Sequence, residues 1–63
     1  MECNLNEWIN KRGYKKKWLA SQIGVSGNVL SRWCNGRSEP SLRNALMLAE
    51  LLECNVEDLF KLK

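Results

Sequence analysis

The sequence contains no histidine, and its three cysteines are widely spaced without a Cys-x-x-Cys pair. A zinc site with cysteine and histidine ligands is therefore excluded. The chain also lacks a phosphate-binding glycine loop and a recognisable catalytic acid pair, so we expect no enzyme, no metal and no other cofactor. Cys3, Cys34 and Cys54 are expected to be reduced, buried or half-buried thiols of a cytoplasmic protein, with redox sensing by Cys34 as the alternative.

Long apolar runs are missing as well. No run approaches the ~20 residues that a membrane-spanning helix needs, and the N-terminus MECNLNEW lacks the apolar stretch of a signal peptide. We therefore expect no membrane partner. Strand alternation, internal repeats and low-complexity segments are also absent. With 63 residues, of which 44% are apolar, the chain is expected to form a single folded domain over residues 1–63.

Acidic residues are scarce in the middle of the chain. Residues 11–43 contain eight lysines or arginines and one acid, Glu39, which leaves seven net positive charges. The flanking segments, residues 1–10 and 44–63, each carry two net negative charges. This asymmetry indicates that one face binds a polyanion, with a charge pattern that only keeps the protein soluble as the alternative.

Apolar residues recur at helical spacing in five segments, which predicts an all-α fold. We expect helices over residues 4–12, 15 or 16 to 23, 27–34, 42–52 and 56–60. The boundaries carry residues that favour helix ends or N-caps, namely Gly13, Gly24, Ser26, Asn35, Gly36, Ser41 and Asn55.

The apolar faces of these helices predict the core. The expected core residues are Leu5, Trp8, Ile9, Leu19, Ala20, Ile23, Leu30, Trp33, Leu42, Ala45, Leu46, Leu48, Ala49, Leu52 and Leu59. The fourth helix carries further apolar residues on its other side, which suggests a second buried surface such as a dimer contact. The possible dimer contacts are Met47, Leu51, Phe60 and Leu62.

The segment over residues 16–36 combines two short helices with a tight turn. Gly24 permits the positive φ of such a turn, and the Ser26 hydroxyl can accept a backbone N–H of the second helix. Ala20 is small enough to let the two helices approach closely. The pattern is typical of a helix-turn-helix motif, whose second helix can lie in the major groove of DNA.

Nearly the whole chain resembles the DNA-binding domain of phage repressor and Cro-type regulators, the XRE family of helix-turn-helix proteins. The resemblance rests on an ordered set of matches: Gly13, Leu19-Ala20, Ile23-Gly24-Val25-Ser26, Leu30-Ser31-Arg32-Trp33, Asn35-Gly36-Arg37, Pro40-Ser41-Leu42, Leu48-Ala49 and Leu59-Phe60. It implies a compact five-helix, lambda-repressor-like DNA-binding domain that needs no small-molecule cofactor.

The resemblance also implies which residues contact DNA. Family members use the third helix for base contacts, and the matching or neighbouring positions here are Gly27, Asn28, Val29, Ser31 and Arg32. Asparagine can pair with adenine and arginine with guanine. Gly27 departs from the usual glutamine-like residue, so one base contact is expected to be missing. Phosphate contacts are implied for Lys15, Lys16, Lys17, Asn35, Arg37, Ser41 and Arg43.

We therefore expect a sequence-specific regulator of transcription that binds double-stranded DNA. A domain of this size reads only about 4–6 base pairs, so we expect a homodimer on a pseudo-palindromic operator, with steric repression as the simplest mechanism. The alternative is a protein-interaction module, such as an antitoxin or antirepressor, that uses the same fold. Its support is a set of extra apolar residues, Trp18, Met47, Leu51, Phe60 and Leu62.

Overall fold

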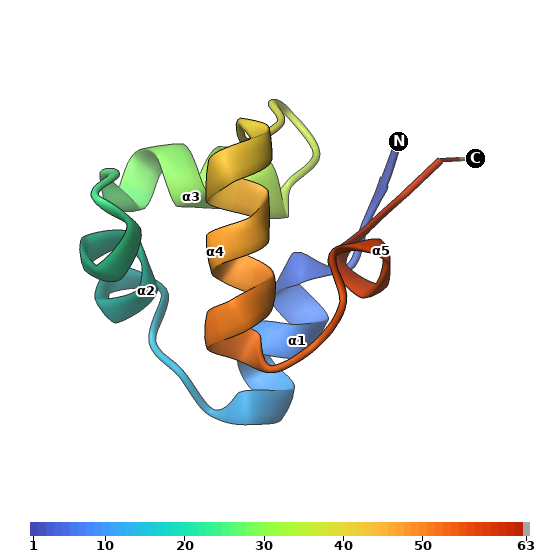
Figure 1. The fold of residues 1–63 in the computed structure, drawn as a ribbon. Helices are drawn as coiled ribbons and strands as arrows, with labels where there is room; N and C mark the ends of the chain where they lie inside the picture. Colours follow the sequence, from blue (N-terminus) through green and yellow to red (C-terminus); the bar gives the residue numbers. More distant parts are fainter. Residues whose placement is uncertain (63) are drawn as a thin grey trace.

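The computed structural model describes residues 1–62, which form five helices and two short strands (Figure 1). In chain order the elements are β1 (Glu2–Cys3), α1 (Leu5–Arg12), α2 (Lys16–Ile23), α3 (Gly27–Cys34), α4 (Leu42–Leu52), α5 (Val56–Leu59) and β2 (Phe60–Lys61). Each helix matches its expected segment to within one residue at either end. The prediction of five helices in an all-α fold is therefore confirmed.

Local chemistry sets most of the helix boundaries. The Ser26 hydroxyl accepts the N–H of Val29 at 3.2 Å, at the start of α3. The Ser41 hydroxyl accepts the N–H of Asn44 at 3.2 Å, at the start of α4. Both predicted N-caps are confirmed, and each gives a partner to an N–H that a helix start leaves unpaired. Gly24 ends α2 with a φ of 78°, a conformation that favours glycine.

The end of α4 is held by a residue from α1. Glu53 follows α4 with a φ of 56° and is the one non-glycine residue within residues 1–62 that has a positive φ. The guanidinium of Arg12 lies over this helix end, where Nε donates to the Leu52 carbonyl at 2.8 Å and Nη2 to the Glu53 carbonyl at 3.1 Å. Arg12 therefore supplies donors to carbonyls that no further helical turn can satisfy.

The core lies between the five helices and contains most of the expected residues. The buried apolar residues are Leu5, Ile9, Leu19, Ala20, Ile23, Leu30, Trp33, Ala45, Leu48, Ala49, Leu52 and Leu59. Trp8 is half-buried and packs against this core. The prediction was wrong for Leu42 and Leu46, which are 73% and 51% exposed. Leu42 lies one turn before the buried stripe of α4, and Leu46 is turned about 100° from Ala45, so neither faces the core.

The two strands are a departure from the expectation that the chain contains none. β1 and β2 pair antiparallel with Glu2 opposite Lys61, and the N–H of Asn4 donates to the Leu59 carbonyl at 2.8 Å. Strands of two residues are too short to show the alternation by which a sequence reveals a strand. The pairing brings the first and last elements together, as the view in Figure 1 shows.

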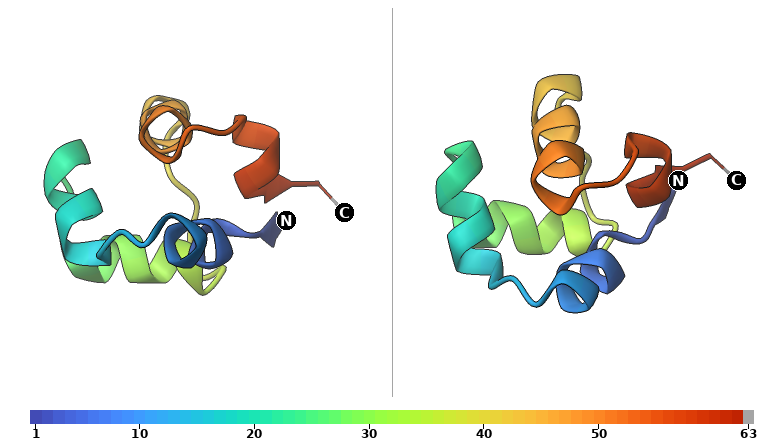
Figure 2. Two further views of the ribbon diagram at one scale, coloured as in Figure 1. Left: turned by 90° about the horizontal axis from the view of Figure 1, so that it is seen from below. Right: turned by 60° about the horizontal axis from the view of Figure 1, so that its bottom comes forward.

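The domain has two distinct ends, one formed by α2 and the other by α5 (Figure 2). Figure 2 shows α2 and α5 at opposite ends, with α1 and α4 between them.

None of the helices within residues 1–62 has the length and apolar character needed to cross a membrane. The same described residues gather no group of three or more Cys, Asp or Glu side chains that could hold a metal ion. All three cysteines are half-buried free thiols.

Candidate nucleic-acid interface

Backbone contacts and core packing fix the turn between α2 and α3. After Gly24, the N–H of Val25 donates to the Ala20 carbonyl at 3.0 Å, and the Val25 side chain packs against the core. Ala20 is itself buried, which allows the close approach of the two helices that its small size predicts. Ser26 then caps α3. The predicted helix-turn-helix is thus present, with α3 held across the end of α2 (Figure 1).

One face of α3 is buried and the other is open. Leu30 and Trp33 point into the core, as predicted. The residues expected to contact bases lie mainly on the open face, with Ser31 half-buried and the others exposed: Gly27, Asn28, Val29 and Arg32. Side chains that can pair with base edges are therefore available on one side of the domain. Their contact with DNA stays a prediction.

The residues expected to contact phosphate lie around the ends of α2, α3 and α4. Lys16 is half-buried at the start of α2. Burial raises the pKa of the Cys34 thiol at the end of α3, and the nearby Lys16 ammonium opposes this by lowering the same pKa. The Lys16 ammonium is therefore within electrostatic range of the end of α3. The other predicted phosphate contacts are all exposed: Lys15, Lys17, Asn35, Arg37, Ser41 and Arg43.

The start of α4 adds to the same region. Arg43 lines an open hollow of about 490 Å³ together with Gly24 and Val25 of the helix-turn-helix turn. Ser41 uses its hydroxyl oxygen to accept the N–H of Asn44, which leaves its hydroxyl hydrogen available to donate. A charged and a neutral donor are thus placed beside the motif.

The helices of the candidate interface, α2, α3 and α4, differ from α1 and α5 in the charge of their first turns. The first turns of α1 and α5 contain acids, namely Glu7 in α1 and Glu57 with Asp58 in α5. The first turns of α2, α3 and α4 contain none, and α2 begins with Lys16 and Lys17 after Lys15, which provides no side-chain cap. The N-terminus of a helix carries partial positive charge, so an acid stabilises it and a lysine does not. The three helices of the candidate interface therefore carry no acidic side chain at their positive ends that would compete with an external anion.

Two of the basic residues counted in the central segment serve the fold. Arg12 binds the end of α4, and the Lys11 ammonium lies 4.6 Å from the centre of the Trp8 ring. The sequence also did not predict that the Tyr14 ring packs against the Trp18 ring, with ring centres 5.1 Å apart and ring planes tilted by 45°. Trp18, which follows the lysines at the start of α2, is 44% exposed. The spacing of apolar residues in the sequence does not predict its contact with Tyr14.

Comparison with known proteins connects this geometry to a family. Residues 4–63 match the model of the Cro/C1-type HTH DNA-binding domain. The chain belongs to this Cro/C1-type family. This Cro/C1-type domain is 32% identical over 60 residues to an uncharacterized HTH-type transcriptional regulator of Archaeoglobus fulgidus, across 95% of this chain and 86% of that protein.

Solved structures agree with the family match. A candidate DNA-binding protein from Bacteroides fragilis superposes with a TM-score of 0.85 at 35% identity, over 90% of this chain and 92% of that chain. The SOS-response transcriptional repressor LexA from Eubacterium rectale superposes with a TM-score of 0.83 at 33% identity, over 95% of this chain and 64% of that chain. The predicted family resemblance is therefore confirmed.

Proposed function

We propose that this Cro/C1-type domain binds double-stranded DNA sequence-specifically and represses transcription by covering a promoter. The observation that carries the proposal is the absence of acids from the first turns of α2, α3 and α4, together with Lys16 and Lys17 at the start of α2 and Arg43 at the start of α4. A cation beside the positive end of a helix, as at the starts of α2 and α4, is unfavourable in the free protein, and phosphates of a DNA backbone relieve this repulsion.

The proposal divides the work between two sets of residues. Asn28 and Arg32, on the open face of α3, pair with base edges in the major groove and supply sequence preference. Val29 is also exposed there and can contact a thymine methyl group. Lys16 and Arg37, near the two ends of the motif, bind phosphates and fix the register of α3 on the duplex.

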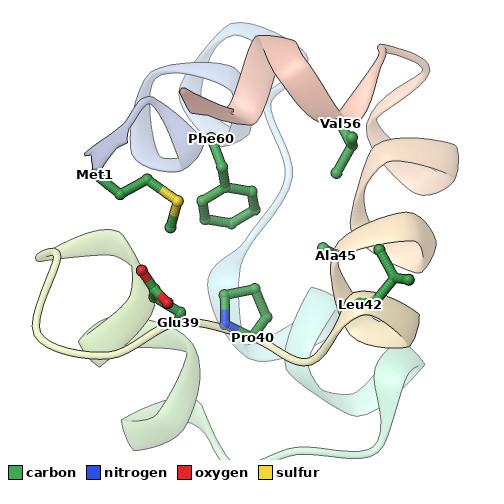
Figure 3. Close-up of a pocket in the computed structure, with 7 residues that line it drawn as sticks. All are labelled: Met1, Glu39, Pro40, Leu42, Ala45, Val56 and Phe60. Atoms are coloured by element: carbon green, nitrogen blue, oxygen red, sulfur yellow. The ribbon is translucent and has the colours of Figure 1, made fainter. Parts of the chain in front are cut away.

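We further propose that two copies bind a pseudo-palindromic operator through the α5 end of the domain. An apolar groove of about 220 Å³ opens there between α5, the start of α4 and the loop before it (Figure 3). Phe60 points into this groove from the α5 side, and Pro40 faces it from the loop. Leu42 also lines the groove, and Leu62, which follows β2, is 91% exposed. Exposed apolar residues in such numbers are typical of protein interfaces.

A second copy of the chain suits this end better than an unrelated partner. Glu39 lines the groove and Lys61 stands exposed in β2, so a two-fold axis can set each beside its opposite charge in the other copy. The α5 end lies opposite α2, so this contact leaves the helix-turn-helix uncovered (Figure 2). A standard interface covers about 800 Å² on each partner, about a fifth of the 4348 Å² surface of this domain.

The dimer proposal therefore uses only part of the predicted contact set. Phe60 and Leu62 belong to the α5 end. Met47 and Leu51 are half-buried and line a different hollow, with Gln22 and Glu50 beside α2. We assign the contact between copies to the first pair.

Selection of bound duplexes from a random pool tests the DNA-binding proposal. We expect an enriched site with two inverted half-sites, together with weaker binding to random duplex that declines as salt concentration rises. A protein that shows no salt-dependent binding to any duplex does not bind DNA, and that outcome would favour a protein-interaction module.

Analytical ultracentrifugation tests the contact between copies. Leu42→Glu places a charge in the apolar groove at a largely exposed position, so the variant should remain folded and sediment as a monomer at concentrations where the unmodified chain self-associates. Gln22→Glu adds the same charge at the opposite end and should sediment like the unmodified chain. Equal self-association of the two variants would place the dimer contact elsewhere.

A further inference from the structure

Gly27 is the one glycine of this chain that the fold does not explain. Gly13, Gly24 and Gly36 have φ values of 75°, 78° and 72°, which L side chains rarely adopt. Gly27 is the first residue of α3 and has no positive φ. Its backbone conformation is open to any residue, so conformational freedom is not the reason for a glycine there.

Packing does not explain Gly27 either. A Cβ atom built on Gly27 has no neighbouring atom within 4 Å, and the residue is exposed. Glycine in a helix is less favourable than alanine, because it loses more backbone freedom on folding. The chain accepts this loss at a position where its own atoms would tolerate a side chain. The reason for a glycine at position 27 is therefore sought in a binding partner of the chain.

We infer that Gly27 is the point where α3 approaches the base edges of the major groove most closely, with bare backbone in place of a side chain. The inference rests on the proposed DNA binding and identifies the feature that sets how deeply α3 enters the groove. Gly27 lies on the same open helix start as Asn28 and Val29, which are both exposed. The N-terminal residues of a recognition helix are those that contact base edges.

The neighbouring side chains require such a close approach. The Asn28 amide is only two carbons from the backbone, so it reaches an adenine only when the helix backbone itself is near the base. The Ser26 side chain is short and is held at the helix start by accepting the N–H of Val29, so it does not reach across a gap between α3 and the bases. The glutamine-like side chain that is usual at this position in the family would fill the space between the start of α3 and the base edges. Gly27 leaves that space to the backbone, which can then bring Asn28 to its base.

Two glycine-to-alanine variants of the full chain, Gly27→Ala and Gly13→Ala, test this inference. Thermal unfolding gives the stability of each, and titration with the operator selected from the random pool gives its affinity below the unfolding transition. Gly27→Ala should raise Tm by about 2–6 °C, because alanine favours the helix, and should weaken operator binding by about tenfold or more. Its binding to random duplex, which depends on phosphates, should change much less.

Gly13→Ala is the matched control, because its Cβ also meets open space but its φ of 75° strains alanine. It should lower Tm and leave operator affinity unchanged below the transition. Two results would overturn the inference: operator affinity that is the same for Gly27→Ala and the unmodified chain, or a lower Tm for Gly27→Ala, which would assign the glycine to the fold. If the unmodified chain binds no duplex at all, DNA binding itself fails, and the two failures are thus distinguished.

Discussion

Removing the Arg12 side chain tests whether a contact between α1 and the end of α4 holds the domain together. Arg12→Ala deletes two hydrogen bonds, at 2.8 Å to the Leu52 carbonyl and 3.1 Å to the Glu53 carbonyl. It also removes a cation that lies 5.5 Å from the centre of the Trp8 ring. The two carbonyls would then depend on water, and α1 would lose its polar link to α4.

Arg12 is exposed to solvent, so we expect each of its contacts to contribute a free energy in the lower half of the range usual for such contacts. We assign about 0.5–1 kcal/mol to each hydrogen bond and about 0.5 kcal/mol to the contact with the ring. The free energy of unfolding should therefore fall by about 2 kcal/mol. For a domain of this length such a loss lowers Tm by about 10 °C.

Circular dichroism during thermal and urea unfolding measures this change, and Lys11→Ala is the control. Lys11 is the neighbouring cation over the same ring at 4.6 Å, yet it makes no hydrogen bond to α4 within the described residues. Its replacement should cost about 0.5 kcal/mol. Arg12→Lys should fall between the two alanine variants, because lysine keeps the charge but lacks the planar pair of donors. Equal destabilisation by Arg12→Ala and Lys11→Ala would refute the role of the two hydrogen bonds.

Four other changes test the interface and the fold. Arg32→Ala should lower operator affinity by about 5- to 150-fold and relax the preference at one base pair; an unchanged Kd in an anisotropy titration would remove Arg32 from the reading face. Lys16→Ala should weaken binding to every duplex and reduce the slope of log K against log salt concentration by about one unit, so an unaltered slope would argue against a phosphate contact. Glu53→Gly should raise the free energy of unfolding in urea by about 1 kcal/mol, because a φ of 56° suits glycine; a loss of stability would contradict this. Burial raises the pKa of Cys34 above its usual 9.0, so the stability that the neutral thiol supports is complete below about pH 9 and is lost as pH rises through the raised value. Urea unfolding should show this decline above pH 9, less steeply for Cys34→Ala, and parallel curves would exclude the effect.

The helices and the helix-turn-helix could be predicted from sequence because their signals are local. Ser26 and Ser41 cap helices through hydroxyl groups three residues from the N–H that they accept. Gly24 marks a turn because few other residues adopt its φ. Such signals depend only on residues a few positions apart in the chain, so they can be recognised without knowledge of the tertiary structure.

The features that were missed depend on contacts across the chain. Arg12 reaches carbonyls 40 and 41 residues away, and its charge alone suggested a polyanion contact instead. Leu42 shares the helical spacing of a core residue but lies beyond the part of α4 that other elements cover. Within the candidate interface, spacing identified the open face of α3 but did not show that Ser31 is half-buried.

The pairing of β1 with β2 has a consequence for how the protein is made. Glu2 leaves the ribosome well before its partner Lys61, because all five helices lie between them in the chain. During translation β1 therefore waits unpaired while the five helices are synthesised. The helix-turn-helix can form earlier from local contacts, but β1 can pair only after β2 has emerged. A nascent chain that stalls before Leu59 would thus leave the Asn4 N–H without its backbone acceptor and the core without the Leu59 side chain.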